Sequence, residues 1–172
     1  MTDEMRYGTR THCRRRWTRR GRRPVCKVRI GYDWAYLFIA LCPYTGDVFG
    51  MLLSHLNKIC FDIFIQQFKE HLTEQSILKE GENLLLIGDG ATAHQSAIVE
   101  KFGIDWQTLP TACPELNPVE RFFQELRKHT SNNTFENIKQ IDELIIKLVK
   151  EYMTNPKAVI KLTLYEYLNT KT

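Results

Sequence analysis

The 172-residue sequence has no apolar run long enough to cross a membrane. Its longest apolar runs, residues 34–42 and 84–87, fall far short of the roughly 20 residues that a spanning helix needs. The first residues, MTDEMRYG, place two acids before any apolar stretch, which is the wrong order for a secretory signal. We therefore expect a cytoplasmic protein that does not act at a membrane.

Cysteine patterns that hold metals or form disulfides are also absent. The five cysteines are widely spaced, odd in number and include no C-x-x-C pair, so neither a zinc site nor a disulfide framework is indicated. We expect reduced thiols, some of them in the core. Hydrophobic residues at 43% and charged residues at 26% are ordinary for a soluble globular chain, and the length suits a single domain over residues 1–172.

Acidic residues are missing from residues 6–30, which hold eleven Lys or Arg residues. The net charge of the whole chain is only +4, so this segment carries +11 and the remainder carries −7. Such a separation predicts a basic hairpin arm that binds a polyanion. A solvated, partly disordered basic tail is the alternative. Apolar residues interleaved with the arginines, such as Trp17 and Val25, argue against that alternative.

The expected secondary structure begins with strands and continues with alternating helices and strands. Segments rich in β-branched, aromatic or continuous apolar residues predict strands at 25–30, 34–41, 48–53, 84–87 and 105–109. Apolar periodicity and capping residues predict helices after Asn57, at 96–101, from Asn117 and Pro118 onward, and at about 135–153. This order predicts an α/β domain with helices flanking a mixed five-stranded sheet, three antiparallel strands followed by parallel ones, as in the ribonuclease-H-like fold.

Asp89 directly follows an expected buried strand, in the segment LLLIGDGATAH. Open α/β sheets place their ligands at the carboxyl ends of such strands. Flanking Gly88 and Gly90 leave room for a group such as a phosphate to approach the carboxylate. The alternative is structural: Asp89 starts a turn or caps the following helix.

Glu120 lies in the first turn of the helix that follows LPTACPELNP. Asn117, Pro118 and Glu120 form a fair capping box, and capping alone would explain all three residues. The prolines of this segment also fix the entry to the helix, and a rigid loop can aim a first-turn carboxylate at a metal ion. Both interpretations fit the sequence.

Asp3 forms an acidic pair with Glu4 in TDEMRYG. Neighbouring strand residues face opposite sides of a sheet, so only one of the two is expected to join a cluster with Asp89. The alternative for Asp3 is a frayed terminal acid without a role.

Three carboxylates repel one another, and a hard cation such as Mg²⁺, which prefers oxygen ligands, would relieve that repulsion. We interpret His94 as a supporting residue that donates to a carboxylate or contacts a phosphate; a purely local hydrogen bond is its alternative.

These motifs resemble a known family. TDEMRYG, R-x-W-T-R-R-G-x-R-P, LLLIGDGATAH and LPTACPELNPVERFFQELR are similar to the DDE endonuclease domain of bacterial insertion-sequence transposases, in the mariner-like superfamily. The resemblance spans roughly residues 1–150, and P-E-L-N-P-V-E is its most specific part. It assigns the three acidic positions of the family to Asp3, Asp89 and Glu120, with 30 residues between the last two.

The resemblance implies a transposase that cleaves DNA and transfers its strands with two Mg²⁺ or Mn²⁺ ions about 3.5–4 Å apart. One ion would activate a water or a DNA 3′-hydroxyl, and the other would stabilise the leaving oxygen. It implies transposon-end and target DNA as partners, with a homodimer as the working unit. The DNA phosphates would be held by the arm residues Arg14, Arg15, Arg16, Arg19, Arg20, Arg22 and Arg23.

Two features depart from the family pattern. The family usually has asparagine after the second aspartate, where this chain has Gly90. The chain also begins two residues before Asp3, so most of the first strand and the N-terminal helix-turn-helix region are expected to be missing. Recognition of transposon ends would then be absent or supplied by a separately encoded polypeptide.

Two rival functions fit parts of the sequence. A phosphatase-like hydrolase could use Asp89 as its nucleophile, but position 91, where such enzymes commonly carry a second aspartate, is alanine. A truncated transposase that binds DNA without turnover would keep the fold and the basic arm. Metal-dependent nicking separates these possibilities.

Overall fold

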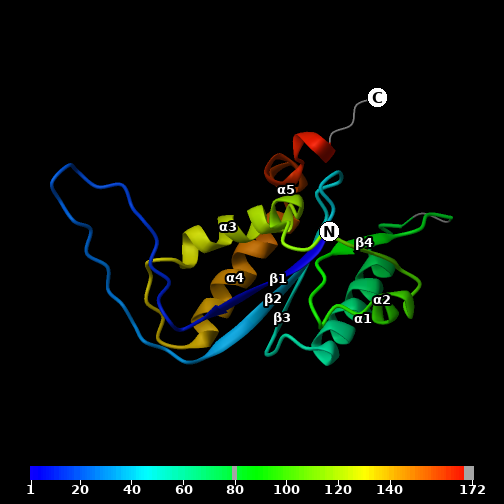
Figure 1. Cartoon of the computed structure of the whole chain (residues 1–172), viewed down its shortest axis with the longest axis horizontal. Coiled ribbons are helices and arrows are strands. Elements are labelled where there is room, and N and C mark those ends of the chain that lie inside the picture. The colour runs from blue at the N-terminus through cyan, green and yellow to red at the C-terminus, as the bar shows by residue number, and fades with distance from the viewer. Residues whose placement is uncertain (79–80, 169–172) are drawn as a thin grey trace.

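The computed structural model describes residues 1–78 and 81–168, and Figure 1 shows their arrangement. Strands β1 (Thr2–Gly8), β2 (Trp34–Leu41) and β3 (Val48–Leu53) form an antiparallel sheet in the order β1-β2-β3. Its register pairs Asp3 with Ile39, and Ile39 with Gly50. Strands β4 (Leu85–Gly88) and β5 (Asp105–Thr108) form a parallel pair. The chain is therefore a mixed α/β fold, as predicted.

The hydrogen bonds divide the strands into two sheets, which corrects the expectation of one continuous five-stranded sheet. Strand β4 nevertheless lies beside β1 (Figure 1). Gly88 explains how close they come: a Cβ at this position would lie 2.9 Å from Thr2 Cγ2 and 2.5 Å from the Trp106 ring. The absence of a side chain at Gly88 thus lets the end of β4 approach the start of β1.

The predicted strand at 25–30 is wrong. Residues 25–30 form no strand, and Val25, Val28 and Ile30 are 90%, 62% and 70% exposed, because no other element of the described chain covers them. The antiparallel sheet takes β1 instead, whose Met5 and Tyr7 are buried. Asp3 thus lies near the start of a seven-residue strand, β1.

Two hydrophobic cores lie on opposite faces of the antiparallel sheet. Helices α1 (Lys58–Glu74) and α2 (Ser96–Glu100) cover the face that carries Phe38 and Ala40. Helices α3 (Val119–Thr130), α4 (Ile138–Met153) and α5 (Pro156–Thr163) cover the face that carries Met5 and Ile39 (Figure 1). Consecutive strand residues, which point to opposite faces, therefore enter different environments.

Local capping sets several helix boundaries. The predicted N-cap Asn57 accepts a hydrogen bond from Cys60 N at 2.9 Å. Helix α4 begins at Ile138 rather than near residue 135, because Asn137 extends the chain and caps Gln140 N. Short 3-10 turns, η1 (Pro114–Leu116) and η2 (Glu166–Leu168), precede α3 and follow α5. Among the described residues, no helix has the length and apolarity needed to cross a membrane.

Candidate active site

Three acidic side chains from separate elements line one cleft. Asp3 comes from β1, Asp89 follows the carboxyl end of β4, and Glu120 lies in the first turn of α3. All three line a cleft of about 360 Å³, together with Asn117 and the connection between β5 and η1. The structure thus brings together the three carboxylates that the sequence singled out.

Asp3 is held at the wall of this cleft by two neighbours. Its Oδ1 accepts from the Glu4 backbone N–H at 2.8 Å, and its Oδ2 accepts from Asn117 Nδ2 at 3.2 Å. Burial raises the pKa of Asp3 from 3.8 to about 7; the Glu4 N–H opposes this shift, and the charges of Glu4, Glu120 and Asp89 add to it. Without a counterion, the cleft therefore disfavours a charged Asp3 near neutral pH.

Asn117 organises the loop before α3. Its Nδ2 donates to Thr2 O at 3.1 Å as well as to Asp3, and its Oδ1 accepts from Val119 N at 3.2 Å. Asn117 is only 2% exposed, so these bonds connect the start of α3 to the start of β1 in a place that solvent does not reach. The proximity of Asp3 to the loop that presents Glu120 depends on this contact.

The capping box proposed for Glu120 does not form. Its reciprocal half requires the Asn117 backbone N–H, but this group donates to Pro114 O at 3.0 Å, and Pro118 occupies the cap position without a side-chain bond. The Glu120 carboxylate instead lies 3.6 Å from Arg127 Nη1, on the next turns of the same helix. A reciprocal capping box therefore does not explain Glu120, which lines the cleft.

Asp89 combines a turn with a place in the cleft. Its Oδ1 accepts from Ala91 N at 3.0 Å, as expected if it starts a turn. The same oxygen lies 2.6 Å from His94 Nδ1, and this hydrogen bond holds the pKa of Asp89 below its usual value. Since the side chain remains 55% exposed, the turn does not remove it from the cleft.

Glu4 is a residue that the sequence reasoning missed. Both of its carboxylate oxygens lie 2.9 Å from His94 Nε2, and the side chains of His94 and Glu4 are 0% and 4% exposed. Burial lowers the pKa of His94, but the bonds to Asp89 and Glu4 more than offset it and raise that pKa to about 10. Strand alternation does send Glu4 away from Asp3. His94 then links Glu4 to Asp89, since an imidazole has two bonding nitrogens.

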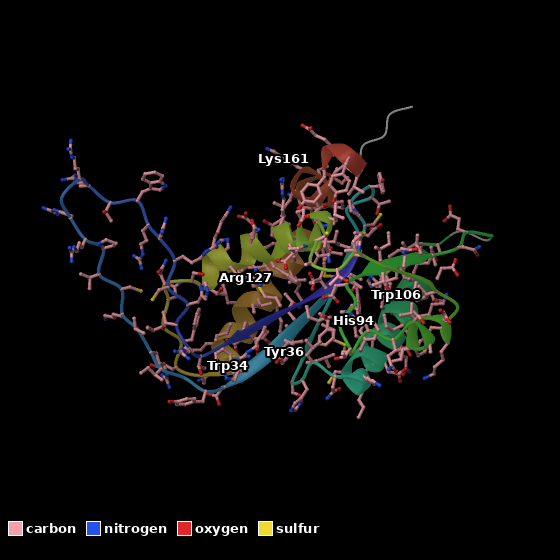
Figure 2. All side chains as sticks on the ribbon, in the orientation of Figure 1. Trp34, Tyr36, His94, Trp106, Arg127 and Lys161 are labelled. Atoms are coloured by element: carbon pink, nitrogen blue, oxygen red, sulfur yellow. The ribbon has the colours of Figure 1, made fainter. Side chains whose placement is uncertain are left out.

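The seven arginines singled out in the basic segment lie apart from the cleft. They belong to residues 9–33, a long excursion between β1 and β2 that extends away from the two cores (Figures 1 and 2). All seven are exposed: Arg14, Arg15, Arg16, Arg19, Arg20, Arg22 and Arg23. The arm is thus shifted from the predicted 6–30, because Arg6 lies within β1 and packs over the Trp34 ring at 4.0 Å.

The carboxylate oxygens of Asp3, Asp89 and Glu120 are suitable donors for divalent cations. Within residues 1–78 and 81–168, no three His, Cys, Asp or Glu side chains are placed to hold a single metal ion. Mg²⁺ commonly takes only one or two protein carboxylates and completes its shell with waters and substrate phosphates. The oxygen chemistry of the cleft and the raised pKa of Asp3 fit such a shared arrangement.

Comparison with known proteins identifies the family. A family model described as "DDE superfamily endonuclease" matches residues 1–145. This chain belongs to the DDE superfamily endonuclease family. An uncharacterized protein of Sinorhizobium fredii, y4pE/y4sA, is 28% identical over 137 residues, which cover 78% of this chain and 96% of that protein.

Solved structures extend the likeness of this DDE endonuclease family member to the fold. The Mos1 mariner paired-end complex with Mn matches 95% of the chain at a TM-score of 0.69 and 11% identity. The catalytic domain of Mos1 mariner transposase matches 77% of the chain and 72% of that domain at a TM-score of 0.59 and 11% identity. The chain spans about half the length of the transposase in the paired-end complexes, 51% and 52% in two of them.

Gly90, which lines the cleft, departs from the pattern expected for this family. Within residues 1–78 and 81–168, a Cβ at Gly90 would meet only Thr108 Cγ2, at 3.4 Å, which is an ordinary van der Waals contact. The glycine is therefore not required by crowding, and a side chain could occupy the position.

Proposed function

We propose that this chain is the catalytic domain of a transposase that cuts and joins DNA with two divalent cations, Mg²⁺ or Mn²⁺. The observation that carries the proposal is that Asp3, Asp89 and Glu120 come from three separate elements and line one cleft. We further propose that the fold is ribonuclease-H-like, with the parallel pair β4–β5 lying beside β1 of the antiparallel sheet. The approach of Gly88 to Thr2 supports this placement.

In this proposal the three carboxylates divide the work of holding the cations. The Asp3 carboxylate has two accepting oxygens, and the charges of both Asp89 and Glu120 act on it. It is therefore suited to be shared, with Asp89 completing one pair and Glu120 the other. When bound, the cations supply an activated water or 3′-hydroxyl and stabilise the leaving oxygen. Asn117 keeps Asp3 oriented for this role through its bond to Oδ2.

DNA is the proposed substrate, and the arm is its proposed holding surface. The seven exposed arginines supply phosphate contacts that position DNA without reading its sequence. Three Mos1 transposase complexes that the chain resembles in fold, one with a left transposon end, one with Mn and one with Mg, support the choice of substrate and cations. We propose a homodimer as the working unit, in keeping with the paired-end complexes of those neighbours.

A DNA-binding protein without turnover is the second candidate. It is favoured by Gly90 and by the absence, among the described residues, of three side chains placed around one metal position. Such a protein would bind DNA through the arm and would not nick it.

Metal-dependent nicking of supercoiled plasmid tests the proposal. Asp89→Asn and Glu120→Gln should each lower the Mn²⁺-dependent nicking rate by more than about 100-fold, because loss of an outer-shell partner alone costs about 10–100-fold. Exposed Glu74→Gln is the matched control and should nick as the parent does. Unchanged activity in both cleft variants would exclude this cleft, and DNA binding without any parental nicking would favour the second candidate.

A further inference from the structure

Glu4, His94 and Asp89 form a continuous hydrogen-bonded chain beside the cleft. His94 Nε2 lies 2.9 Å from each oxygen of Glu4, and His94 Nδ1 lies 2.6 Å from Asp89 Oδ1. The chain runs from the first strand to the turn after β4, so it joins the antiparallel sheet to the parallel pair. Asp3 and Glu4 are adjacent in sequence but relate to Asp89 differently. Asp3 lines the same cleft as Asp89, whereas Glu4 is linked to Asp89 through the His94 imidazole.

The roles of the ring nitrogens follow from the partners. An ionised carboxylate only accepts hydrogen bonds, so His94 donates from Nε2 to Glu4 and from Nδ1 to Asp89. Two opposed donors fix the plane of the ring as well as its position. The rings of Phe61 in α1 and Trp106 in β5, centred 4.7 Å and 6.0 Å from that of His94, pack against it as well. His94 therefore has little freedom to turn away from Asp89.

This arrangement also selects one oxygen of Asp89. Both bonds to the carboxylate, from His94 Nδ1 and from Ala91 N, use Oδ1. Within the part of the chain that the structure describes, no hydrogen bond engages Oδ2. With Oδ1 fixed from two directions, the carboxylate plane is set and Oδ2 is the oxygen available to a ligand in the cleft.

Glu4 is an unusual choice for stability alone. Its side chain is 4% exposed and belongs to the sheet face that packs on α1 and α2. Removing a carboxylate from water carries a large desolvation cost, and well-packed apolar residues often stabilise such a position as well or better. What the buried Glu4 carboxylate provides is a fixed orientation of the His94 ring.

We propose that Glu4 is a positioning residue of the carboxylate cleft: it holds His94 so that His94 fixes Asp89 with Oδ2 presented to a divalent cation. The inference rests on the proposed function, since it assigns Asp89 to a cation. It adds a fourth acidic residue to the working site, one that does not touch the cation itself. Glu4 acts through the imidazole, and its removal should weaken cation binding without destroying the ligand set.

Mn²⁺ binding to the full chain, measured by isothermal titration calorimetry, tests the proposal without relying on turnover. Glu4→Ala should weaken Mn²⁺ binding by about 10–100-fold, the usual effect of losing an outer-shell partner. Glu4→Gln keeps an acceptor oxygen for His94 Nε2 and should restore most of the affinity. Exposed Glu74→Gln removes the same charge elsewhere and should bind as the parent does.

A purely structural role would give a different pattern. Glu4→Ala would then lower the melting temperature, while the folded protein would bind Mn²⁺ as tightly as the parent; that result overturns the proposal. Raising the Mn²⁺ concentration should recover nicking in Glu4→Ala, because weak binding is overcome by mass action. It should not recover nicking in Asp89→Asn. If Glu4→Ala does not fold, Glu4→Gln and His94→Ala are compared instead. The proposal is overturned if Glu4→Gln loses as much Mn²⁺ affinity as His94→Ala does.

Failure of the proposed function gives its own signature. In that case the parent protein binds no Mn²⁺, or Asp89→Asn binds it as well as the parent does. Both the cation site and the positioning role of Glu4 are then refuted. If the parent binds Mn²⁺, Asp89→Asn does not, and Glu4→Ala is unchanged, only the role of Glu4 is refuted.

Discussion

The cleft and the arm are built in opposite ways. Asp3, Asp89 and Glu120 are carried by elements with buried cores on both sides of the sheet, and buried Asn117 and His94 fix the positions of two of them. The arm at residues 9–33 has no helix or strand, and its seven arginines are all exposed. The body that carries the cleft holds the excess of negative charge, and the arm holds the excess of positive charge.

The difference reflects what each region has to do. Holding cations and a scissile phosphate requires side chains placed to within about 0.5 Å, and only packed elements with supporting hydrogen bonds achieve this. Attracting a polyanion requires charge density, because phosphate contacts tolerate many geometries. The cleft should therefore be sensitive to single substitutions, whereas the arm should respond to the number of charges removed.

Neutralising the arm should produce the largest effect on DNA affinity. With about five arginines on phosphates, log K against log salt should have a slope of about −4 to −5. Replacing all seven arginines with glutamine should weaken binding at 50 mM salt by more than about 100-fold and flatten this slope. Fluorescence anisotropy with labelled duplex DNA measures both, while Mn²⁺ binding in the cleft should be unchanged.

A charge-matched control separates the arm from general electrostatics. One variant neutralises Arg14, Arg15 and Arg16 of the arm, and the other neutralises exposed Lys139, Lys147 and Lys150 of α4. The arm variant should lose more affinity and more of the salt slope than the α4 variant. Equal losses would mean that net charge, and not the arm, holds DNA.

Asn117→Ala tests whether single substitutions damage the cleft. The change removes both bonds from Nδ2 and the bond to Val119 N in a site that is 2% exposed. Leaving buried partners unsatisfied costs about 1–3 kcal/mol, and each 1 kcal/mol lowers the melting temperature by about 2–4 °C at this chain length. Exposed Asn83→Ala is the control. A melting temperature within about 1 °C of the parent would show that Asn117 does not tie α3 to β1.

The same contrast explains how far the sequence predicts the molecule. Periodicity and capping predict α1, and an apolar run before a glycine-rich turn predicts the strand β4. The expected burial of β4 is met only in part, because Leu86 and Gly88 are buried whereas Leu85 is 51% exposed. The segment 25–30 has the same β-branched composition but stays exposed, since composition does not say whether another element is available to cover it. The partly acidic β1 has a weak strand signal in the sequence, because its apolar residues are interrupted by Asp3, Glu4 and Arg6.

The limits at the cleft have a similar cause. Motif spacing predicts which carboxylates share the cleft, and the structure places all three there. Strand alternation correctly separates Asp3 from Glu4, but it describes one strand only. The link from Glu4 to Asp89 passes through His94, 90 residues away in sequence from Glu4, and depends on β4 lying beside β1. A local sequence pattern does not predict contacts between residues so far apart in sequence.

Comparing the thermal stability of Asp3→Asn with that of the parent at several pH values should reveal the repulsion between carboxylates in the cleft. The pKa of Asp3 is raised to about 7 in the folded protein, above its value of 3.8, so folding favours the protonated form. The metal-free parent should therefore lose stability relative to Asp3→Asn as pH rises from about 4 to 7, and the full difference should persist above pH 7. At pH 8 we expect Asp3→Asn to melt about 2–4 °C higher, corresponding to about 1 kcal/mol.

Divalent cations provide the control for this prediction. Saturating Mg²⁺ should raise the melting temperature of the parent at pH 8, since it neutralises the carboxylates that repel one another. It should stabilise Asp3→Asn much less. A difference between the two proteins that is the same at pH 4 and pH 8 would contradict the raised pKa of Asp3, because no titration of this group would then be linked to folding.

The smallest effect is expected where the arm meets the body. Asn132 Oδ1 accepts from Arg14 N at 3.0 Å, and Asn132 N donates to His12 O at 2.9 Å, so this residue latches the arm to the end of α3. Asn132 has a φ of 60°, which glycine adopts without strain. Asn132→Gly removes the bond from Arg14 N and the weaker one that Asn132 Oδ1 accepts from Cys26 Sγ at 3.8 Å. Together they are worth about 0.5–1 kcal/mol, or about a 2–5-fold loss of DNA affinity.

The neighbouring Asn133→Gly is the matched control, because its side chain bonds to His129 O and not to the arm. Trypsin should cut the arm faster in Asn132→Gly than in Asn133→Gly, while the melting temperatures of the two variants should be similar. Equal cleavage rates and equal DNA affinities would show that the latch does not restrain the arm. The charge density of the arm alone would then account for DNA binding. The cleft would depend on fixed side-chain positions, whereas the arm would bind DNA without being held in place.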